Sequence, residues 1–558
     1  MFSRFSLKPL TAGFAGALLV GLSACSGDSA ESRMQEQAAA IPAPSQVHLP
    51  QPGMAGRHKL DAQRAYAPSP AYAVQPPLIE REQYASLADN PVQAVAEQPV
   101  STFSIDVDTG SYANVRRFLN GGRLPPADAV RLEEMVNYFP YDYPAPQTDT
   151  PFGVSTELAA TPWNPQSRLL RIAIQASELQ TAELPPANLV FLVDVSGSMH
   201  RREGLPMVQA TLRLLVDQLR AQDRVSLVTY AGTSEVVLEP TSGSEKATIR
   251  QAIDNLVAGG STAGESGIRL AYQQAEKGFI EKGINRILLA TDGDFNVGIN
   301  DFESLKKLAA EKRKSGVSLT TLGFGMGNYN EQLMEQLADA GDGNYAYIDT
   351  LREARKVLVE QLASTLTVLA RDVKIQVEFN PAQVSEYRLL GYENRALKRE
   401  DFSNDKVDAG EIGAGHRVTA LYEIVPVGKR GWLEPLRYQT TAETSGSADK
   451  SGELAMLRLR WKAPDESRSR LLEIPVQAEA AGTQAQASED LRFAAAVAAV
   501  AQQRKGGTYT GEFSLADSAE LARAAKGEDR FGLRGEFVQL VELAQSLKAS
   551  SGRSGRAD

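Results

Sequence analysis

The 558-residue chain has few residues that support covalent or thiolate-based chemistry. It contains one cysteine, Cys25, and four histidines, His48, His58, His200 and His416. A single cysteine excludes intramolecular disulfides and a zinc site built on thiolates. The four histidines are widely scattered in the sequence and show no metal-ligand spacing.

The chain also lacks an excess of positive charge. Lys and Arg number 59 against 69 Asp and Glu, which gives a net charge of −10 at pH 7. Neutralising a phosphate backbone needs clustered Lys and Arg, so we expect no nucleic-acid partner. An acidic balance is compatible with binding metal cations. Hydrophobic residues make up 42% and charged residues 23%, which excludes a fully disordered chain, a collagen-like fibre and a polytopic membrane protein.

Signatures of catalysis are missing as well. The chain has no G-x-S-x-G elbow, and Ser304-x-x-Lys307, which fits the S-x-x-K pattern of penicillin-recognising enzymes, has no K-T-G partner. The glycine-rich run Gly323–Gly327 is not followed by the Lys-Ser/Thr of a phosphate loop. We therefore expect a protein that is not an enzyme. A cell-envelope hydrolase with an unrecognised site stays open as a less favoured alternative.

The beginning of the chain has the features of a secretory signal. Arg4 and Lys8 give a positively charged start, and the apolar stretch 10–22 that follows is too short to span a bilayer comfortably. The stretch ends just before the only cysteine of the chain. We therefore expect a signal peptide over residues 1–25.

The four residues Leu22-Ser-Ala-Cys25 resemble the lipobox of bacterial lipoproteins, in which the cysteine carries the lipid. The alternative is an ordinary signal peptide followed by a free cysteine. The resemblance implies a lipid anchor at Cys25 that needs no transmembrane helix. Ser26, in place of an aspartate, implies a cell-envelope location, lipid-anchored in the outer membrane and facing the periplasm.

Composition and periodicity divide the rest of the chain. Residues 26–100 are rich in Ala, Gln, Pro and Ser and predict a disordered tether. Residues 187–368 alternate apolar strands with helices, which predicts a doubly wound, mostly parallel α/β sheet. The other segments are an N-terminal helical segment with one or more sandwich strands over 101–186, a flanking antiparallel β-sandwich over 369–480, and a C-terminal helical region over 485–550.

Within these segments the spacing of apolar residues predicts individual elements. Helical spacing predicts one helix over 128–139 and another over 352–366. The alternating strand pattern within 152–180 is of the same kind as the pattern after residue 371. The two could belong to one sandwich, which would make the α/β module an insertion between its strands.

Polar side chains follow the apolar strands of the predicted parallel sheet. Asp194-x-Ser196-x-Ser198 stands where the first strand ends, Thr262 stands in a loop before a helix, and Asp292 follows the fourth strand. The carboxyl ends of parallel strands meet at the usual ligand crevice of this architecture. Carboxylates and hydroxyls offer only oxygen ligands, which favour Mg²⁺, or Mn²⁺ or Ca²⁺, over zinc. A carboxylate from a partner could complete the coordination shell.

These residues, in this order, resemble the metal-ion-dependent adhesion site of the von Willebrand factor type A (VWA) domain. The resemblance implies that Ser196, Ser198 and Thr262 coordinate the metal directly and that Asp194 and Asp292 act directly or through water. It also implies that residues 187–368 form a VWA domain. The whole chain resembles bacterial lipoproteins in which a VWA domain lies between an N-terminal VWA-associated segment and a C-terminal domain of unknown function. The runs that carry this wider resemblance are 102–112, 137–141 and 292–298.

The function implied is that of a membrane-anchored, extracytoplasmic protein-binding module. Its divalent cation would bind an acidic residue of a partner protein. The main alternative is a structural envelope scaffold in which the metal only holds loops together. A further alternative for Asp194 and Ser196 is that they merely cap the following helix, a common role of these residue types.

Two weaker acidic motifs point elsewhere. The spacing from Asp292 to Glu303 imitates an EF-hand loop, but Val297 occupies the position where the sharp turn requires glycine. The run Asp106-x-Asp108 could be a small calcium loop, but a turn held by aspartate side chains is the favoured interpretation. We expect neither motif to be a calcium site.

Overall fold

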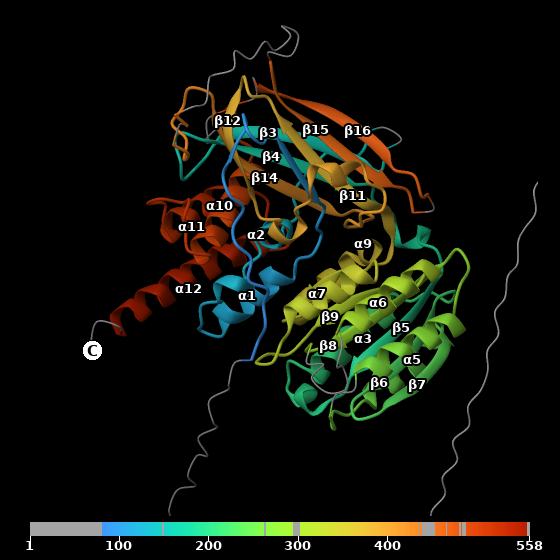
Figure 1. The fold of residues 1–558 in the computed structure, drawn as a ribbon. Helices are drawn as coiled ribbons and strands as arrows, with labels where there is room; N and C mark the ends of the chain where they lie inside the picture. The colour runs from blue at the N-terminus through green and yellow to red at the C-terminus, as the bar shows by residue number, and fades with distance from the viewer. Residues whose placement is uncertain are drawn as a thin grey trace, which may run out of the picture. The chain divides into compact units, whose positions relative to one another are not determined.

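The computed structural model describes residues 81–147, 150–261, 264–293, 302–434, 436–437, 452–464, 466–478, 481–482 and 487–554 (Figure 1). All of them belong to one compact unit, Pro76–Asp558. The predicted signal peptide, Cys25 and most of the predicted tether lie outside the described residues. Among the described helices, none combines the length and the apolar character needed to cross a membrane.

The middle of the chain forms a six-stranded sheet, in the strand order β10-β9-β8-β5-β6-β7. Neighbouring strands are parallel except for the pair β6 and β7. The central strand β5 is buried at every position, as a strand covered on both faces must be. The strands are β5 (Ala187–Asp194), β6 (Arg224–Tyr230), β7 (Ser234–Ser242), β8 (Ile284–Thr291), β9 (Ser318–Gly323) and β10 (Tyr345–Tyr347).

Helices cover both faces of this sheet. Leu189, Phe191 and Val193 of β5 share a core with α3 and α4, whereas Val190 and Leu192 share a core with α5, α6 and α7. The alternation follows from the two-residue period of a strand. The predicted doubly wound α/β fold is confirmed. The helices are α3 (Leu205–Gln218), α4 (Lys246–Asp254), α5 (Gly264–Lys277), α6 (Phe302–Lys312), α7 (Glu331–Ala340), α8 (Leu351–Arg355) and α9 (Leu362–Leu366).

Two further sheets enclose a separate apolar core. The first has the order β1-β12-β14-β4-β3-β17, and the second has the order β13-β11-β15-β16, with β2 also paired to β11. The first sheet contains β1 (Gln93–Ala94), β3 (Phe152–Ala160), β4 (Arg168–Ala176), β12 (Val384–Leu390), β14 (Arg417–Pro426) and β17 (Ala481–Gly482). The second contains β2 (Val100–Ser104), β11 (Val368–Phe379), β13 (Ile412–Gly413), β15 (Glu453–Lys462) and β16 (Arg470–Gln477).

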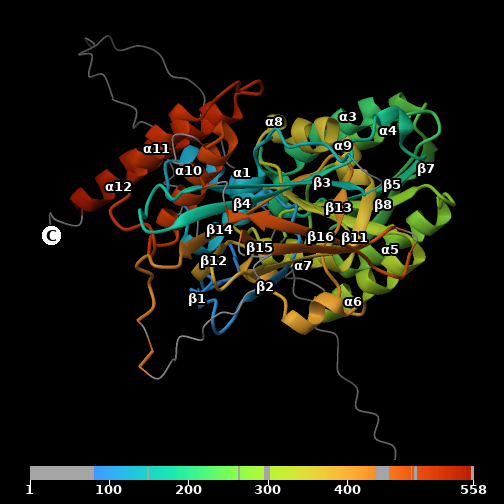
Figure 2. The ribbon, with the colours of Figure 1, turned by 90° about the horizontal axis from the view of Figure 1, so that it is seen from above.

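The parallel-sheet module is inserted into this sandwich. Strand β4 precedes the module in the chain, and β14 follows it, yet the two pair along their length as antiparallel neighbours. Figure 2 shows β3, β4 and β14 on one side of the sandwich and β11, β15 and β16 on the other. Segments that precede and follow the α/β module in the sequence therefore build one sheet. The chain thus enters and leaves the module beside the sandwich.

Helices from the two ends of the described chain share a third apolar core. The rings of Phe139, Phe493 and Phe537 pack edge to face at its centre, with centroids 4.9–5.6 Å apart. Figure 1 shows the three C-terminal helices together, in red, beside the blue N-terminal ones. The helices are α1 (Gly110–Asn120), α2 (Leu132–Asn137), α10 (Glu489–Arg504), α11 (Leu515–Ala524) and α12 (Leu533–Ser554).

Two predicted helices are interrupted. In the predicted helix 128–139, Val130 and Arg131 have extended backbone, and the Arg131 N–H donates to the Ser111 hydroxyl at 2.9 Å. Only the short turn Ala127–Ala129 and α2 remain helical. The predicted helix 352–366 is divided into α8, a wider π-helical turn η5 (Lys356–Glu360), and α9.

The predicted end of the tether at residue 100 is wrong, because residues 81–99 make specific contacts. Strand β1 pairs with β12. Gln83 lies parallel to the loop before α7: its N–H donates to the Tyr329 carbonyl at 2.8 Å, and its carbonyl accepts from the Glu331 N–H at 3.1 Å. The Arg81 N–H donates to the Gly327 carbonyl, also at 2.8 Å. The segment 81–84 is therefore part of the folded unit.

Candidate metal centre

Asp194 is the last residue of β5 and is fully buried. One carboxylate oxygen accepts from the Ser196 N–H at 2.8 Å. The other accepts from the Thr291 hydroxyl at 2.8 Å and from the Tyr230 hydroxyl at 3.4 Å. Three donors thus fix the carboxylate at the carboxyl end of the sheet, between β5 and its two parallel neighbours β6 and β8.

The two serines of the motif lie close together. After Asp194 the chain turns into the short helical segment η3 (Gly197–His200), and Ser196 is buried at its start while Ser198 is exposed. Their hydroxyl oxygens are 3.0 Å apart. Within the described residues the Ser196 hydroxyl, at the N-cap position, makes no side-chain hydrogen bond to the backbone of the segment. The capping interpretation of Ser196 therefore does not describe this loop.

Asp292 follows β8 at the same edge of the sheet and is also buried. Its Oδ2 accepts from the Asn328 amide at 3.1 Å. Asn328 follows the glycine-rich run Gly323–Gly327 in the chain. Gly325 has a left-handed backbone (φ +76°), and a Cβ built there would stand 3.3 Å from the Asp292 Cβ. The glycine-rich turn therefore packs against this carboxylate.

A third loop lies against the D-x-S-x-S turn, and we call the group formed by this loop, residues 194–198 and Asp292 the metal crevice. The Gly259 N–H donates to the Val195 carbonyl at 2.7 Å, and the Gly197 N–H donates to the Gly260 carbonyl at 3.0 Å. These two bonds tie the loop after α4 to the D-x-S-x-S turn. Thr262, the fifth predicted ligand, lies outside the described residues, just beyond this tied segment.

The electrostatics of the crevice favour a positive charge. Burial, reinforced by the negative charge of Asp292, raises the pKa of Asp194 to about 6, although hydrogen bonds from Ser196 and Thr291 act in the opposite direction. Two carboxylates therefore repel one another in a desolvated place. Within the described residues no group of three or more His, Cys, Asp or Glu side chains is placed to hold a metal ion. A cation in this crevice would therefore depend on two carboxylates and neighbouring hydroxyls.

The other polar motifs have structural surroundings. The Asp108 N–H donates to Asp106 Oδ1 at 3.0 Å, which makes the aspartate-held turn, and Arg395 pairs with Asp106 at 3.1 Å. Ser304 is exposed on α6, and His200 is exposed at the end of η3. Most of the EF-hand-like run, residues 294–301, lies outside the described residues.

Three segments of the chain match known protein families. Residues 188–361 match the von Willebrand factor type A domain family, and residues 78–171 match a family described as von Willebrand factor. Residues 364–547 match the family described as uncharacterized protein YfbK, C-terminal. The chain therefore contains a VWA domain and a YfbK-like C-terminal region.

The chain is 52% identical over 471 residues to the uncharacterized protein YfbK of Escherichia coli (strain K12), covering 83% of this chain and 81% of that protein. The chain belongs to the YfbK family. Another relative of this YfbK-family chain, the uncharacterized protein sll0103 of Synechocystis, is 34% identical over 189 residues, covering 34% of this chain and 43% of that protein.

Among solved structures, a von Willebrand factor type A protein from Catenulispora acidiphila is similar at 15% identity and a TM-score of 0.39, covering 71% of this chain and 91% of that one.

Proposed function

We propose that this YfbK-family protein is a binding module that holds a divalent cation at Asp194, Ser196, Ser198, Thr262 and Asp292. The cation, Mg²⁺ or else Mn²⁺ or Ca²⁺, presents an open coordination position to an acidic side chain of a partner protein. The observation that carries the proposal is the pair of serine hydroxyl oxygens 3.0 Å apart beside a buried, hydrogen-bonded Asp194.

The serine spacing suits an octahedral ion. Adjacent ligands around an ion with bonds of ~2.0–2.1 Å are about 2.8–3.0 Å apart. Ser196 and Ser198 have that separation, and their hydroxyls are neutral, so they leave most of the ion's charge for a further ligand. Both oxygens of Asp194 already accept hydrogen bonds, which supports a role for this carboxylate through water.

Binding, rather than catalysis, also fits the histidines of the described region. His416 accepts a hydrogen bond from the Gly413 N–H at 3.0 Å, and His200 is exposed beside the metal loop. Neither is hydrogen-bonded to a serine or threonine hydroxyl among the described residues. A nucleophile activated by a histidine base is therefore not part of the proposal.

The test is a titration of the full chain with Mn²⁺, followed by Mg²⁺ and Ca²⁺ competition, for wild type and Asp194→Asn. We expect wild type to bind one Mn²⁺ that Mg²⁺ displaces, and Asp194→Asn to bind at least about tenfold more weakly, because the negative charge beside the ion is lost. The matched control is Asp217→Asn, an exposed carboxylate paired with Arg250. Equal Mn²⁺ affinity in all three proteins would refute the site.

The open coordination position is tested on the Mn²⁺-loaded protein. N-acetyl-aspartate amide should lower the relaxation enhancement of bulk water protons by displacing a metal-bound water, whereas N-acetyl-asparagine amide should not. The effect should vanish with EDTA. A metal that binds without any response to the aspartate compound would favour the scaffold alternative, in which the ion only joins loops.

We also propose that a lipid on Cys25 anchors the module at the cell envelope, on the outer membrane facing the periplasm. The support is the lipobox resemblance of Leu22–Cys25. Detergent phase separation tests it: the wild-type protein should enter the detergent phase, and Cys25→Ser should stay in the aqueous phase. The same partition for both proteins would remove the anchor from the proposal.

A further inference from the structure

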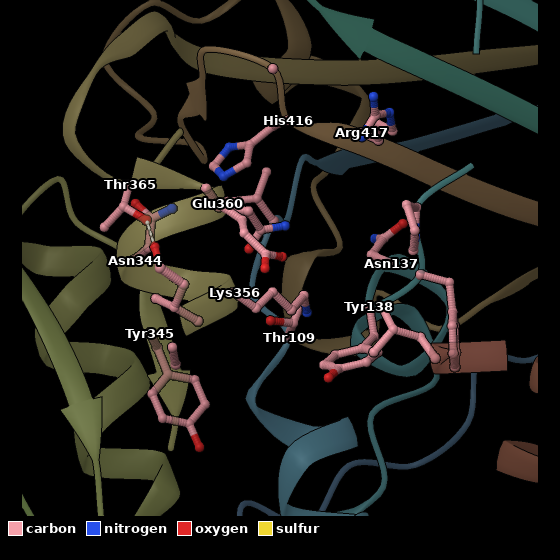
Figure 3. Close-up of a pocket in the computed structure, with 18 of the residues that line it drawn as sticks. Thr109, Asn137, Tyr138, Asn344, Tyr345, Lys356, Glu360, Thr365, His416 and Arg417 are labelled. Atoms are coloured by element: carbon pink, nitrogen blue, oxygen red, sulfur yellow. Dashed lines mark hydrogen bonds between the residues drawn. The ribbon is translucent and has the colours of Figure 1, made fainter. Parts of the chain in front are cut away.

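A cavity of about 190 Å³ lies between the α/β module, the sandwich and the terminal helices, away from the metal crevice (Figure 3). Its wall includes Lys356, His416 and Arg417, which we call the basic wall. Val357, Phe531 and Leu533 supply apolar lining. The volume is below the ~300–1,000 Å³ typical of sites for drug-sized ligands, so an occupant must be smaller.

Lys356 is a buried cation whose hydrogen-bonding capacity is not used by the part of the chain that the structure describes. Its Nζ has no hydrogen-bond partner within the described residues and lies 3.3 Å from the centre of the Tyr138 ring. Glu353 is its ion-pair partner, with Oε1 at 3.6 Å from Nζ, beyond hydrogen-bond distance, while Oε2 of the same carboxylate accepts from Arg116 and Tyr138. Burial lowers the pKa of Lys356 to about 8, so an acceptor placed here would be strongly favoured.

His416 offers a second donor. Its Nδ1 accepts from the Gly413 N–H at 3.0 Å, so the proton of the neutral ring belongs on Nε2. Burial and the neighbouring charge of Arg286 lower the pKa of His416 to about 4, so the ring is neutral at pH 7. Arg417 adds a cation whose Nε has no acceptor in the described region and whose Nη2 meets Glu178 at 3.2 Å, an exposed pair.

Arg286 strengthens the positive field behind the wall. It is fully buried, and its Nη1 donates at 2.6 Å to the hydroxyl of Thr320, which lines the cavity. Burial lowers the pKa of Arg286 to about 10, although the negative charges of Asp342 and Glu411 oppose the shift, and its Nε has no hydrogen-bond partner within the described residues. Burying a guanidinium is costly, so an anion in the adjoining cavity would offset part of that cost.

One negative group moderates this field. Glu360 lines the cavity, is exposed, and stands between His416 and Lys356 in Figure 3. Among the lining residues themselves, two cations and one carboxylate give a single net positive charge when His416 is neutral; Glu353 and Glu178, the ion-pair partners of Lys356 and Arg417, stand outside the lining. A monoanion matches this balance better than a doubly charged phosphate does.

We propose that this cavity is a binding site for a small carboxylic acid, whose carboxylate accepts hydrogen bonds from the basic wall and whose hydrocarbon part packs on Val357, Phe531 and Leu533. The site does not involve the metal crevice. Its ligand is recognised by one negative charge together with an apolar body, because the cavity supplies an apolar lining beside its donors.

The experiment is calorimetric titration of the full chain with benzoate, acetate, benzamide and inorganic phosphate. We expect benzoate to bind more tightly than acetate, and benzamide and phosphate to bind at least about tenfold more weakly than benzoate, because they lack the charge or the apolar body. Lys356→Met should abolish benzoate binding. Glu360→Gln should tighten it several-fold, because it removes a repelling charge from an exposed position without disturbing the core.

Matched controls separate this site from others. Arg355→Gln changes an exposed cation at the end of α8, next to Lys356 in the chain, that does not line the cavity, and it should leave benzoate affinity unchanged. Benzoate binding should persist in EDTA and in the Asp194→Asn variant. A loss of benzoate binding can therefore be distinguished from a loss of metal binding.

A second readout uses Lys356 directly. Benzoate should slow the acetylation of Lys356 by an amine-reactive acetylating reagent at pH 8. Mass spectrometry measures the rate of this modification. No benzoate binding by folded wild type would overturn the proposal. So would equal affinity in Glu360→Gln and wild type together with unprotected Lys356.

Discussion

Gly325 shows how one missing side chain shapes the candidate metal site. Its left-handed backbone is a conformation that residues with a Cβ adopt only at a cost in free energy. A Cβ added to Gly325 would stand 3.3 Å from the Asp292 Cβ. An alanine methyl there would push on the carboxylate that Asn328 holds. A change at this glycine should therefore affect the metal site as well as the fold.

We expect Gly325→Ala to weaken Mn²⁺ binding and to lower the free energy of unfolding by about 1–2 kcal/mol. Gly428→Ala is the matched control, because Gly428 has a similar φ of +84° but open space around its Cβ position. It should lose a similar amount of stability and keep full Mn²⁺ affinity. Isothermal titration and urea unfolding measure both quantities. Unchanged Mn²⁺ affinity in folded Gly325→Ala would contradict this account.

At the residue scale, the sequence located the strand-end positions of the candidate site. Asp194 and Asp292 could be predicted to share one edge because each follows an apolar run typical of a buried parallel strand. Thr291 and Asn328, which hydrogen-bond these carboxylates, were missed. Thr291 is part of strand β8, and Asn328 is far from Asp292 in the sequence and comes close to it only in the folded protein. No local sequence pattern therefore marks either residue.

At the scale of elements, helices α2 and α7 bring buried carboxyl groups together. Glu133 of α2 and Glu331 of α7 are buried, and neither of the two oxygens of each has a hydrogen-bond partner within the described residues. Burial raises the pKa of Glu133 to about 7 and that of Glu331 to about 8, with Arg131 opposing the shift in both. The other charged groups that act on this pair are Glu82, Asp106, Glu335 and Glu393.

These shifts give stability a pH dependence of definite sign. An unfolded glutamate titrates near its ordinary pKa of 4.5, so between about pH 4.5 and 8 these two carboxyl groups bind more protons in the folded protein than in the unfolded chain. Their contribution to the free energy of unfolding should therefore fall as pH rises through this range, while His416, whose pKa is lowered, acts with the opposite sign below about pH 6.5. Glu331→Gln should reduce the slope and raise the melting temperature at pH 8.5.

Calorimetric melting between pH 5 and 9 makes the comparison, with exposed Glu520→Gln as the control that should keep the wild-type slope. A Glu331→Gln protein with the same pH slope as wild type would show that this carboxyl group is ionised throughout the range.

Helices and strands could be predicted where the buried positions carry apolar side chains. Strand β5 is apolar along its length and buried along its length. Strand β12 was missed because it buries charges: Arg388 donates to Glu423 at 2.9 Å, and Glu386 accepts from the Trp432 N–H at 2.8 Å. In the predicted helix 352–366 the apolar residues keep helical spacing throughout. The π-helical turn Lys356–Glu360 could therefore not be predicted from that spacing.

At the scale of the whole molecule, one buried arginine joins three separate parts of the chain. Arg116 of α1 donates through Nε to Asp349 at 2.7 Å and through Nη2 to Glu353 of α8 at 2.8 Å. Its Nη1 donates to the Tyr138 hydroxyl at 2.8 Å and to Glu536 of α12 at 3.2 Å. N-terminal segment, VWA domain and C-terminal helices therefore meet at this guanidinium.

Arg116→Met should lower the free energy of unfolding by about 3–5 kcal/mol, because it removes the guanidinium that donates to both of the buried carboxylates Asp349 and Glu353. Arg213→Met removes an exposed partner of Asp254 and should cost less than about 1 kcal/mol. Urea unfolding followed by intrinsic fluorescence measures both. Similar losses in the two variants would mean that Arg116 adds no more than a surface ion pair.

The backbone pairing of residues 81–84 with the loop before α7 gives the protein a mechanical property. A pulling force applied to the chain before residue 81 acts first on two backbone hydrogen bonds. They run from the Arg81 N–H to the Gly327 carbonyl and from the Gln83 N–H to the Tyr329 carbonyl. Asn328, which holds Asp292, lies between those two anchor points. A pull from that direction is thus transmitted to the rim of the crevice before it loads either sheet of the sandwich.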